Sequence, residues 1–173
     1  MKSATLYILS GLPGAGKSTL AQTLSTELNC AYLRIDTIEQ AIRDLCGFKV
    51  EGEGYRLAYR IAADNLNSGI SVISDSCNPI ELTRAEWREV AIDSGASFID
   101  IEVICSDKDE HRTRVEKRSS TVPGLKLPTW EQVMNRDYHP WDSNRIVLDT
   151  AGKSTAESLQ ELILLIKKWH EII

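Results

Sequence analysis

The sequence has no apolar stretch near the roughly 20 residues that a membrane-spanning helix needs. Its start, Met1-Lys2-Ser3, leads into a short apolar run over Leu6–Leu9. That run is too brief for the core of a signal peptide. We therefore expect a cytoplasmic protein with no membrane partner.

Cysteine is scarce and basic charge is not in excess. The four cysteines, Cys30, Cys46, Cys77 and Cys105, are widely spaced and form no CxxC pair, which excludes a disulfide framework and a typical zinc site. The net charge is -5, so the surface as a whole is not that of a nucleic-acid-binding protein. A local basic cleft remains compatible with this balance.

The chain of 173 residues, 42% of them hydrophobic, matches one domain over residues 1–173. Short apolar runs predict strands at Thr5–Leu9, Ala31–Arg34, Ser71–Ser74, Phe98–Cys105 and Arg145–Leu148. Helical patterns cover Lys17–Asn29, Asp36–Leu45, Gly54–Asn67, Leu82–Ser94, Lys108–Arg118, Trp130–Tyr138 and Thr155–Ile172. This alternation predicts an α/β protein with a parallel sheet, helices on both faces and ligands at the carboxyl ends of the strands.

A phosphate-binding motif follows the first predicted strand. Residues 11–18 read GLPGAGKS, which matches GxxxxGK[ST] between a strand and a helix. Such a loop turns its N–H groups inward toward phosphate oxygens, Lys17 adds a positive charge and the Ser18 hydroxyl binds Mg²⁺. The alternative is an ordinary glycine turn before a helix that binds no ligand. We assign nucleotide binding to Gly11, Pro13, Gly14, Ala15, Gly16, Lys17, Ser18 and Thr19.

The chain length and the motifs that are missing narrow the class of P-loop protein. No Asn-Lys-x-Asp segment for reading guanine is present, and the chain is short for a motor or ring ATPase. Three segments, SGLPGAGKST at 10–19, Arg34-Ile35-Asp36 and ISDSCNP at 73–79, resemble the small P-loop kinases. That resemblance implies a three-layer fold with a five-stranded parallel sheet in the order 2-3-1-4-5. It also implies a lid over ATP at about residues 112–128, and a base site near residues 150–153.

Asp36 is the candidate general base. In the kinases that the sequence resembles, an Asp at this position accepts the proton of the substrate hydroxyl. Asp36 and Glu39 also fit a capping box for the next helix, so the role of Asp36 stays open. Polynucleotide kinases usually carry Arg where Glu39 stands, which argues against a phosphorylated or a polynucleotide acceptor. Arg43 is a candidate substitute, or a solvated residue of the helix face.

Asp75 and Asn78 follow the third predicted strand. Asp75 resembles the Walker-B acid that would hold Mg²⁺ opposite Ser18, and a turn-initiating Asp is its alternative. Asn78 precedes a proline in a segment that resembles the substrate-side loop, so it is either an acceptor ligand or a turn residue.

Two arginines on the charged helix before the lid share one face. Arg114 and Arg118 are four residues apart and match the lid arginines that stabilise charge on the transferred phosphoryl group. They also match a solvated face paired with Glu110 and Glu116. The aromatic segment 138–141 either stacks on a ligand or packs at the lid hinge, and we favour packing.

The pattern as a whole predicts an ATP- and Mg²⁺-dependent kinase that phosphorylates a hydroxyl of a small-molecule acceptor. Its expected catalytic residues are Lys17, Asp36, Arg114 and Arg118, with Ser18 and Asp75 at the metal. A polynucleotide 5′-hydroxyl kinase and a nucleotide-sensing module without transfer chemistry are the alternatives. Nucleic acid is not expected as a partner. The residues leave open the acceptor, the choice between ATP and GTP, and the oligomeric state.

Overall fold

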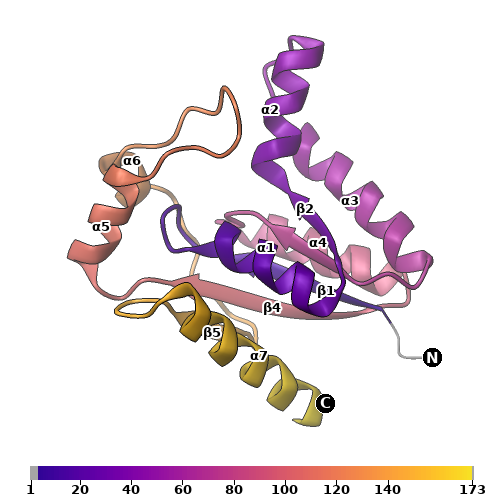
Figure 1. The fold of residues 1–173 in the computed structure, drawn as a ribbon. Coiled ribbons are helices and arrows are strands. Elements are labelled where there is room, and N and C mark those ends of the chain that lie inside the picture. Colours follow the sequence, from indigo (N-terminus) through magenta and orange to yellow (C-terminus); the bar gives the residue numbers. More distant parts are fainter. Residues whose placement is uncertain (1–3, 173) are drawn as a thin grey trace.

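The computed structural model describes residues 4–172 as one five-stranded sheet (Figure 1). The strands are β1 (Thr5–Ser10), β2 (Ala31–Arg34), β3 (Val72–Asp75), β4 (Ser97–Ile104) and β5 (Ile146–Asp149). Their order is β2-β3-β1-β4-β5 and every neighbouring pair is parallel. This confirms the predicted order and the α/β class.

Helices cover both faces of this sheet. They are α1 (Lys17–Leu28), α2 (Ile35–Cys46), α3 (Glu53–Asn67), α4 (Glu81–Asp93), α5 (Lys108–Lys117), α6 (Trp130–Met134) and α7 (Thr155–Ile172). Helices α1 and α7 pack on one face, whereas α3 and α4 pack on the other (Figure 1). Among the described residues, no helix combines the length and the apolar character that crossing a membrane would require.

The central strand explains why both faces are covered. All six residues of β1 are buried, with Leu6 and Ile8 in the core under α3 and α4, and Tyr7 and Leu9 in the core under α1 and α7. A strand buried on both faces suits the middle of a parallel sheet. Its neighbours end beside it, since Leu9 is in register with Asp75, and Asp75 with Arg34. The polar residues that end these strands therefore meet at one edge.

Two predicted boundaries were wrong in an informative way. The helix expected over Trp130–Tyr138 ends at Met134. Beyond this helix, the backbone N–H of His139 donates to the Pro79 carbonyl oxygen at 2.7 Å. The chain therefore leaves the helical path to contact the loop after β3. The helix expected from Asp36 begins at Ile35 instead, with Arg34 as its N-cap residue.

Candidate active site

The loop between β1 and α1 adopts the conformation that its glycines permit. Gly11 has a φ of +135°, and a Cβ there would collide with the Val103 carbonyl oxygen. Gly16 has a φ of +97° and is the N-cap of α1. Lys17 is 8% exposed, and its Nζ donates to the Leu12 carbonyl oxygen at 3.0 Å across the loop. A lysine that closes over its own loop in this way is positioned to meet phosphate oxygens.

A cavity of about 510 Å³ lies above this loop, at the carboxyl ends of β1, β2 and β3. Its floor is formed by the phosphate loop, its sides by α2 and the end of β3, and its roof by residues 119–128, the lid loop. Of the predicted site residues, the cavity lining includes Pro13, Gly14, Gly16, Lys17, Ser18, Thr19, Asp36, Arg43, Asp75, Arg114 and Arg118. Gly11, Ala15 and Asn78 are not in that lining.

Asp36 faces the cavity with its carboxylate free. Within residues 4–172 no hydrogen bond reaches its side chain, and the N-terminus of α2 has no side-chain cap. The capping-box interpretation is therefore wrong. Glu39, its expected partner, instead accepts from Arg43 Nη2 at 3.1 Å, while burial raises the pKa of Glu39. The carboxylate of Asp36 is thus available for chemistry in the cavity.

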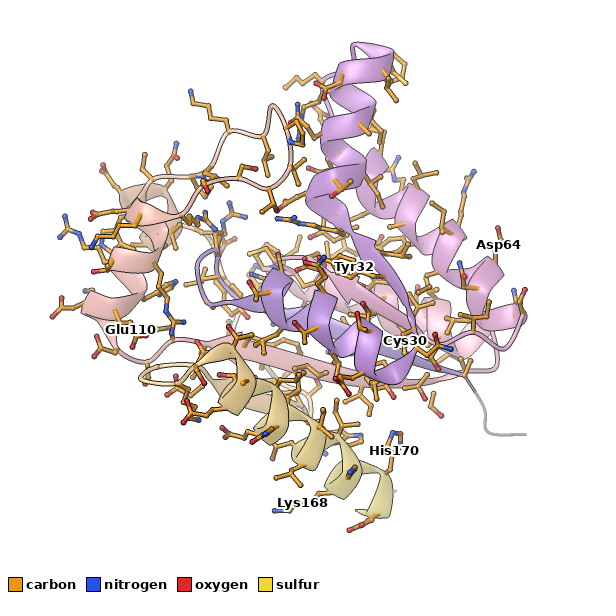
Figure 2. All side chains as sticks on the ribbon, in the orientation of Figure 1. Cys30, Tyr32, Asp64, Glu110, Lys168 and His170 are labelled. Atoms are coloured by element: carbon orange, nitrogen blue, oxygen red, sulfur yellow. The ribbon has the colours of Figure 1, made fainter. Side chains whose placement is uncertain are left out.

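Asp75 is buried and has one oxygen held by protein groups. The Tyr32 hydroxyl donates to Asp75 Oδ2 at 2.8 Å, and Arg34 Nε lies 3.8 Å from the same oxygen. Burial, with the charge of Asp75, raises the pKa of Tyr32, so its hydroxyl stays protonated as a donor. Tyr32 lies on β2, the edge strand that pairs with β3 (Figure 2). Sequence reasoning missed Tyr32, because its partner lies 43 residues away.

The other oxygen of Asp75 fits a magnesium site. Within the described chain no hydrogen bond reaches Asp75 Oδ1, and Ser18 lines the same cavity. Mg²⁺ in nucleotide sites is held by one or two protein oxygens together with phosphates and water. Residues 4–172 contain no cluster of three His, Cys, Asp or Glu side chains suited to a metal.

Arg114 is tied to the phosphate loop through Thr150. Its Nη1 and Nη2 donate to the Thr150 hydroxyl and carbonyl oxygens at 2.8 and 2.9 Å. The Thr150 hydroxyl is also 3.0 Å from the Ala15 carbonyl oxygen. Glu110 accepts from Arg114 at 2.6 Å, and Figure 2 shows Glu110 on α5 near the loop before α7. Arg114 thus pairs with Glu110, as the alternative interpretation expected, and it also lines the cavity.

Two side-chain nitrogen atoms of Arg118 are buried and lack hydrogen-bond partners. Its Nε and Nη2 are inaccessible to solvent and have no hydrogen-bond partner. Burial lowers the pKa of Arg118, and the charges of Arg136 and Arg34 lower it further, whereas Asp36 opposes them. A guanidinium in this setting suits an incoming anion, because a ligand oxygen would satisfy the donors that the fold leaves open.

The lid loop reaches across the cavity to the other wall. Arg34 Nη1 donates to the Thr121 hydroxyl at 2.7 Å, which joins β2 to the lid loop. Gly124 approaches Gln40 on α2, and Figure 1 shows the lid loop extending toward that helix. The base of the lid is held to the phosphate loop by His111, whose Nε2 lies 2.9 Å from the Pro13 carbonyl oxygen.

Asn78 has a structural position that differs from the expected one. It is fully buried, with a φ of +42°, and its amide donates to the Leu9 carbonyl oxygen at 2.9 Å. The backbone carbonyl oxygen of Asn78 accepts a hydrogen bond from Arg84 Nε at 2.9 Å. The expectation that Asn78 contacts an acceptor is not met, because its side chain anchors the loop after β3 to β1.

Arg84 was missed by sequence reasoning because it lies inside a helix. It is fully buried and donates to the carbonyl oxygens of Asn78, Pro79, His139 and Pro140 at 2.9, 3.2, 3.0 and 3.3 Å. Its guanidinium also lies 4.0 Å from the centre of the Trp141 ring and 5.0 Å from that of Tyr138. The aromatic segment therefore packs on Arg84, which agrees with the favoured interpretation.

Comparisons with known proteins agree with this geometry. A family model described as an AAA domain matches residues 6–136. An adenylyl-sulfate kinase of Acaryochloris marina is 27% identical over 92% of this chain and 80% of the relative. The APS kinase CysC of Mycobacterium tuberculosis, solved with AMPPNP and APS, has a TM-score of 0.70 and 20% identity over 96% of this chain and 99% of the other. A gluconokinase of Sinorhizobium meliloti has a TM-score of 0.69 and 15% identity over 99% of this chain and 96% of the other.

The fold and the phosphate loop define a P-loop protein, and the chain belongs to the AAA-domain family that matches most of its length. Its sequence relatives are adenylyl-sulfate kinases, which supports an ATP-dependent kinase of the small P-loop type. This confirms the resemblance on which the sequence analysis relied. The two structural likenesses are below 25% identity and bear on the fold alone.

Proposed function

We propose that the protein transfers the γ-phosphate of ATP to a hydroxyl group of a small molecule bound beside Asp36. The observation that carries this proposal is the joint lining of one cavity. The phosphate-loop lysine, a free carboxylate and an arginine with unsatisfied donors all border it: Lys17, Asp36 and Arg118. Phosphoryl transfer needs positioning and charge stabilisation more than covalent chemistry, and these groups supply both.

The proposed reaction is a direct in-line displacement. The acceptor hydroxyl oxygen forms a bond to the γ-phosphorus while the bond from that phosphorus to the β,γ-bridging oxygen breaks. Asp36 takes the hydroxyl proton, and ADP leaves with the bridging oxygen. Lys17 and Arg118 stabilise the charge on the transferred group, whereas Arg114 serves mainly to join the lid helix to the phosphate loop through Thr150.

Magnesium fits the donors that face the cavity. The Ser18 hydroxyl and the unengaged oxygen of Asp75 would hold the ion, while Tyr32 and Arg34 orient the carboxylate. When bound, Mg²⁺ neutralises charge on the β- and γ-phosphates. Ser18 and Asp75 keep these roles because a hydroxyl and a carboxylate are the hard oxygen donors that this ion prefers.

A second cavity borders the first turn of α1 and the loop before α7. It has a volume of about 330 Å³ and is lined by Gly16, Thr19, Thr150, Lys153 and Ser158, among others. The Ser158 hydroxyl is buried and has no hydrogen-bond partner. We infer that the base of the nucleotide lies in this cavity, near the segment expected from the sequence.

Two variants test the proposal. Lys17→Ala should bind ATP more weakly, and Asp36→Asn should bind ATP normally but lose transfer, since only the second removes the proton acceptor. The measurement is ATP affinity by calorimetry beside ADP release with a panel of hydroxylated acceptors that includes adenylyl sulfate. Unchanged ADP release from Asp36→Asn would contradict the role of this carboxylate.

A further inference from the structure

We propose that Arg34 is a positioning residue that couples the metal carboxylate of Asp75 to closure of the lid loop. This inference rests on the proposed function, since it takes Asp75 as a magnesium ligand. Two observations carry it. The guanidinium of Arg34 lies between Asp75 and Thr121. The lid loop is an ordered turn that fits against α2, the helix that begins beside Arg34.

Arg34 lies at the junction of a strand, a helix and the metal site. It is the last residue of β2 and the N-cap residue of α2, two positions before Asp36. Its partner in the parallel register is Asp75, the last residue of β3. Parallel neighbours end at one edge of the sheet, so the strand pairing sets the two backbones side by side. The side chain of Arg34, rather than its backbone, is therefore the part that responds to the charge of Asp75.

The guanidinium of Arg34 faces two competing partners. Its Nη1 donates to the Thr121 hydroxyl at 2.7 Å, whereas its Nε lies 3.8 Å from Asp75 Oδ2 and is buried with no hydrogen-bond partner. The contact with the lid loop is a full hydrogen bond, and the contact with the carboxylate is a charge attraction alone. Because the side chains of Arg34 and Asp75 are only 19% and 3% exposed, solvent screens this attraction little.

This competition gives the coupling its sign. A carboxylate with its full negative charge draws the guanidinium toward Asp75 and away from Thr121, which loosens the lid loop. With that carboxylate neutralised by a cation, Arg34 keeps its hydrogen bond to Thr121 and the lid loop stays closed. The effect is reciprocal, because a closed lid holds Arg34 back from Asp75 and leaves the carboxylate to the metal. The lid loop therefore closes preferentially over a metal-loaded nucleotide.

The lid loop is ordered enough for one hydrogen bond to hold it. The Ser120 hydroxyl donates to the Val122 carbonyl oxygen at 2.8 Å and accepts from the Val122 N–H at 3.0 Å. The Leu125 N–H donates to the same carbonyl oxygen at 3.2 Å, and Val122 is buried. Among residues 4–172, the bond from Arg34 to Thr121 is the hydrogen bond that ties this turn to the opposite wall of the cavity.

The shape of the turn matches α2 in this closed position. Gly124 has a φ of +78°, and a Cβ there would lie 3.1 Å from Gln40 Nε2. The same Gln40 nitrogen donates to Asp44 Oδ1 at 2.9 Å, which fixes the Gln40 side chain. Figure 1 shows the lid loop reaching toward α2 from the side of α5 and α6. This close fit indicates that the loop has a defined resting position against α2.

Trypsin cleavage after Lys126 measures how often the lid loop opens. Lys126 is exposed and precedes Leu127 in this loop. The cleavage rate follows the open population when opening and closing are faster than cutting. The rate would be measured by mass spectrometry with saturating AMPPNP, a non-hydrolysable ATP analogue, in Mg²⁺ and in EDTA. In the wild type we expect Mg²⁺ to slow this cleavage by about 3- to 10-fold, the effect of one charge-assisted hydrogen bond.

Variants of both residues assign the protection to their contact. Thr121→Val removes the hydroxyl but keeps the shape, and Arg34→Met removes the guanidinium, so each should abolish the difference between Mg²⁺ and EDTA. Thr121→Ser is the matched control, because it keeps the hydroxyl and should keep the protection. Arg34→Met and Thr121→Val together should behave like either variant alone. Equal protection in the wild type and in Thr121→Val, or no effect of Mg²⁺ in the wild type, would overturn the inference.

Unfolding separates this role from a merely structural one. Thr121 is exposed, so Thr121→Val should keep Tm within about 2 °C of the wild type while it loses the Mg²⁺-dependent protection. Neither readout needs phosphate transfer. Metal-dependent protection through Arg34 in a protein that phosphorylates no acceptor would support the inference and defeat the proposed reaction. Transfer activity with a lid loop that closes equally in Mg²⁺ and in EDTA would overturn the inference and leave the proposed function intact.

Discussion

Replacing Arg84 by methionine should destabilise the protein strongly without touching the cavity. The four backbone carbonyl oxygens that Arg84 binds are contributed by the loop after β3 and by residues 139–140. Breaking several buried hydrogen bonds to a charged donor, together with the contact to the Trp141 ring, should cost about 3–5 kcal/mol. The hydrogen-bond losses do not add fully, because Pro79 keeps its bond from the His139 N–H.

Thermal and urea unfolding would measure this loss. For a chain of this size each kcal/mol lowers Tm by about 2–4 °C, so the expected shift is about 6–20 °C. Tryptophan fluorescence would follow the transition directly, since Trp141 lies against Arg84. Arg112→Met is the control and should change the free energy of unfolding by less than about 1 kcal/mol, because its ion pair is exposed. A free energy of unfolding for Arg84→Met within about 1 kcal/mol of the wild type would refute this reasoning.

Three further variants probe the site. Tyr32→Phe removes the hydroxyl that holds Asp75, and the Mg²⁺ concentration for half-maximal activity should rise about tenfold; an unchanged Mg²⁺ titration would count against this support of the metal ligand. Gly14→Ala places a Cβ 2.5 Å from a Val115 methyl at a φ of +88°, so ATP affinity measured by calorimetry should fall at least about tenfold; an unchanged affinity would show that this loop conformation is not needed. Lys17→Ala should lower kcat/KM for ATP by about 100-fold or more in the ADP-release assay.

The strands and helices could be predicted because their signals are local, whereas the strand order came from the resemblance to the small P-loop kinases. Short apolar runs marked the strands, and the P-loop fixed the join between β1 and α1. The same locality explains the errors. Asp36 and Glu39 have the spacing of a capping box, yet the helix begins one residue earlier and Glu39 turns to Arg43. Local spacing does not reveal where a helix begins when a strand runs directly into it.

The parts of the site that the sequence did not predict depend on distant contacts. Tyr32 supports Asp75 across 43 positions, and Arg84 reaches residues 139–140 across more than 50. The buried and unpaired nitrogen atoms of Arg118 depend on the tertiary packing around this side chain, which no spacing rule encodes. Residue type alone therefore suggested which groups could act, and only the packing separated the free carboxylate of Asp36 from the buried amide of Asn78.

The most direct test of the proposed chemistry is phosphate transfer from labelled ATP with Mg²⁺. The panel would contain sugars, polyol acids, phosphate esters, nucleosides, adenylyl sulfate and 5′-hydroxyl oligonucleotides, each with wild-type and Asp36→Asn protein. We expect a labelled small-molecule product with the wild type and a loss of about 100-fold or more in Asp36→Asn, with ATP affinity unchanged. A product formed equally by both proteins would contradict the assignment of Asp36 as the base. No product with any acceptor, despite ATP binding, would contradict the proposed transfer reaction for this set of acceptors.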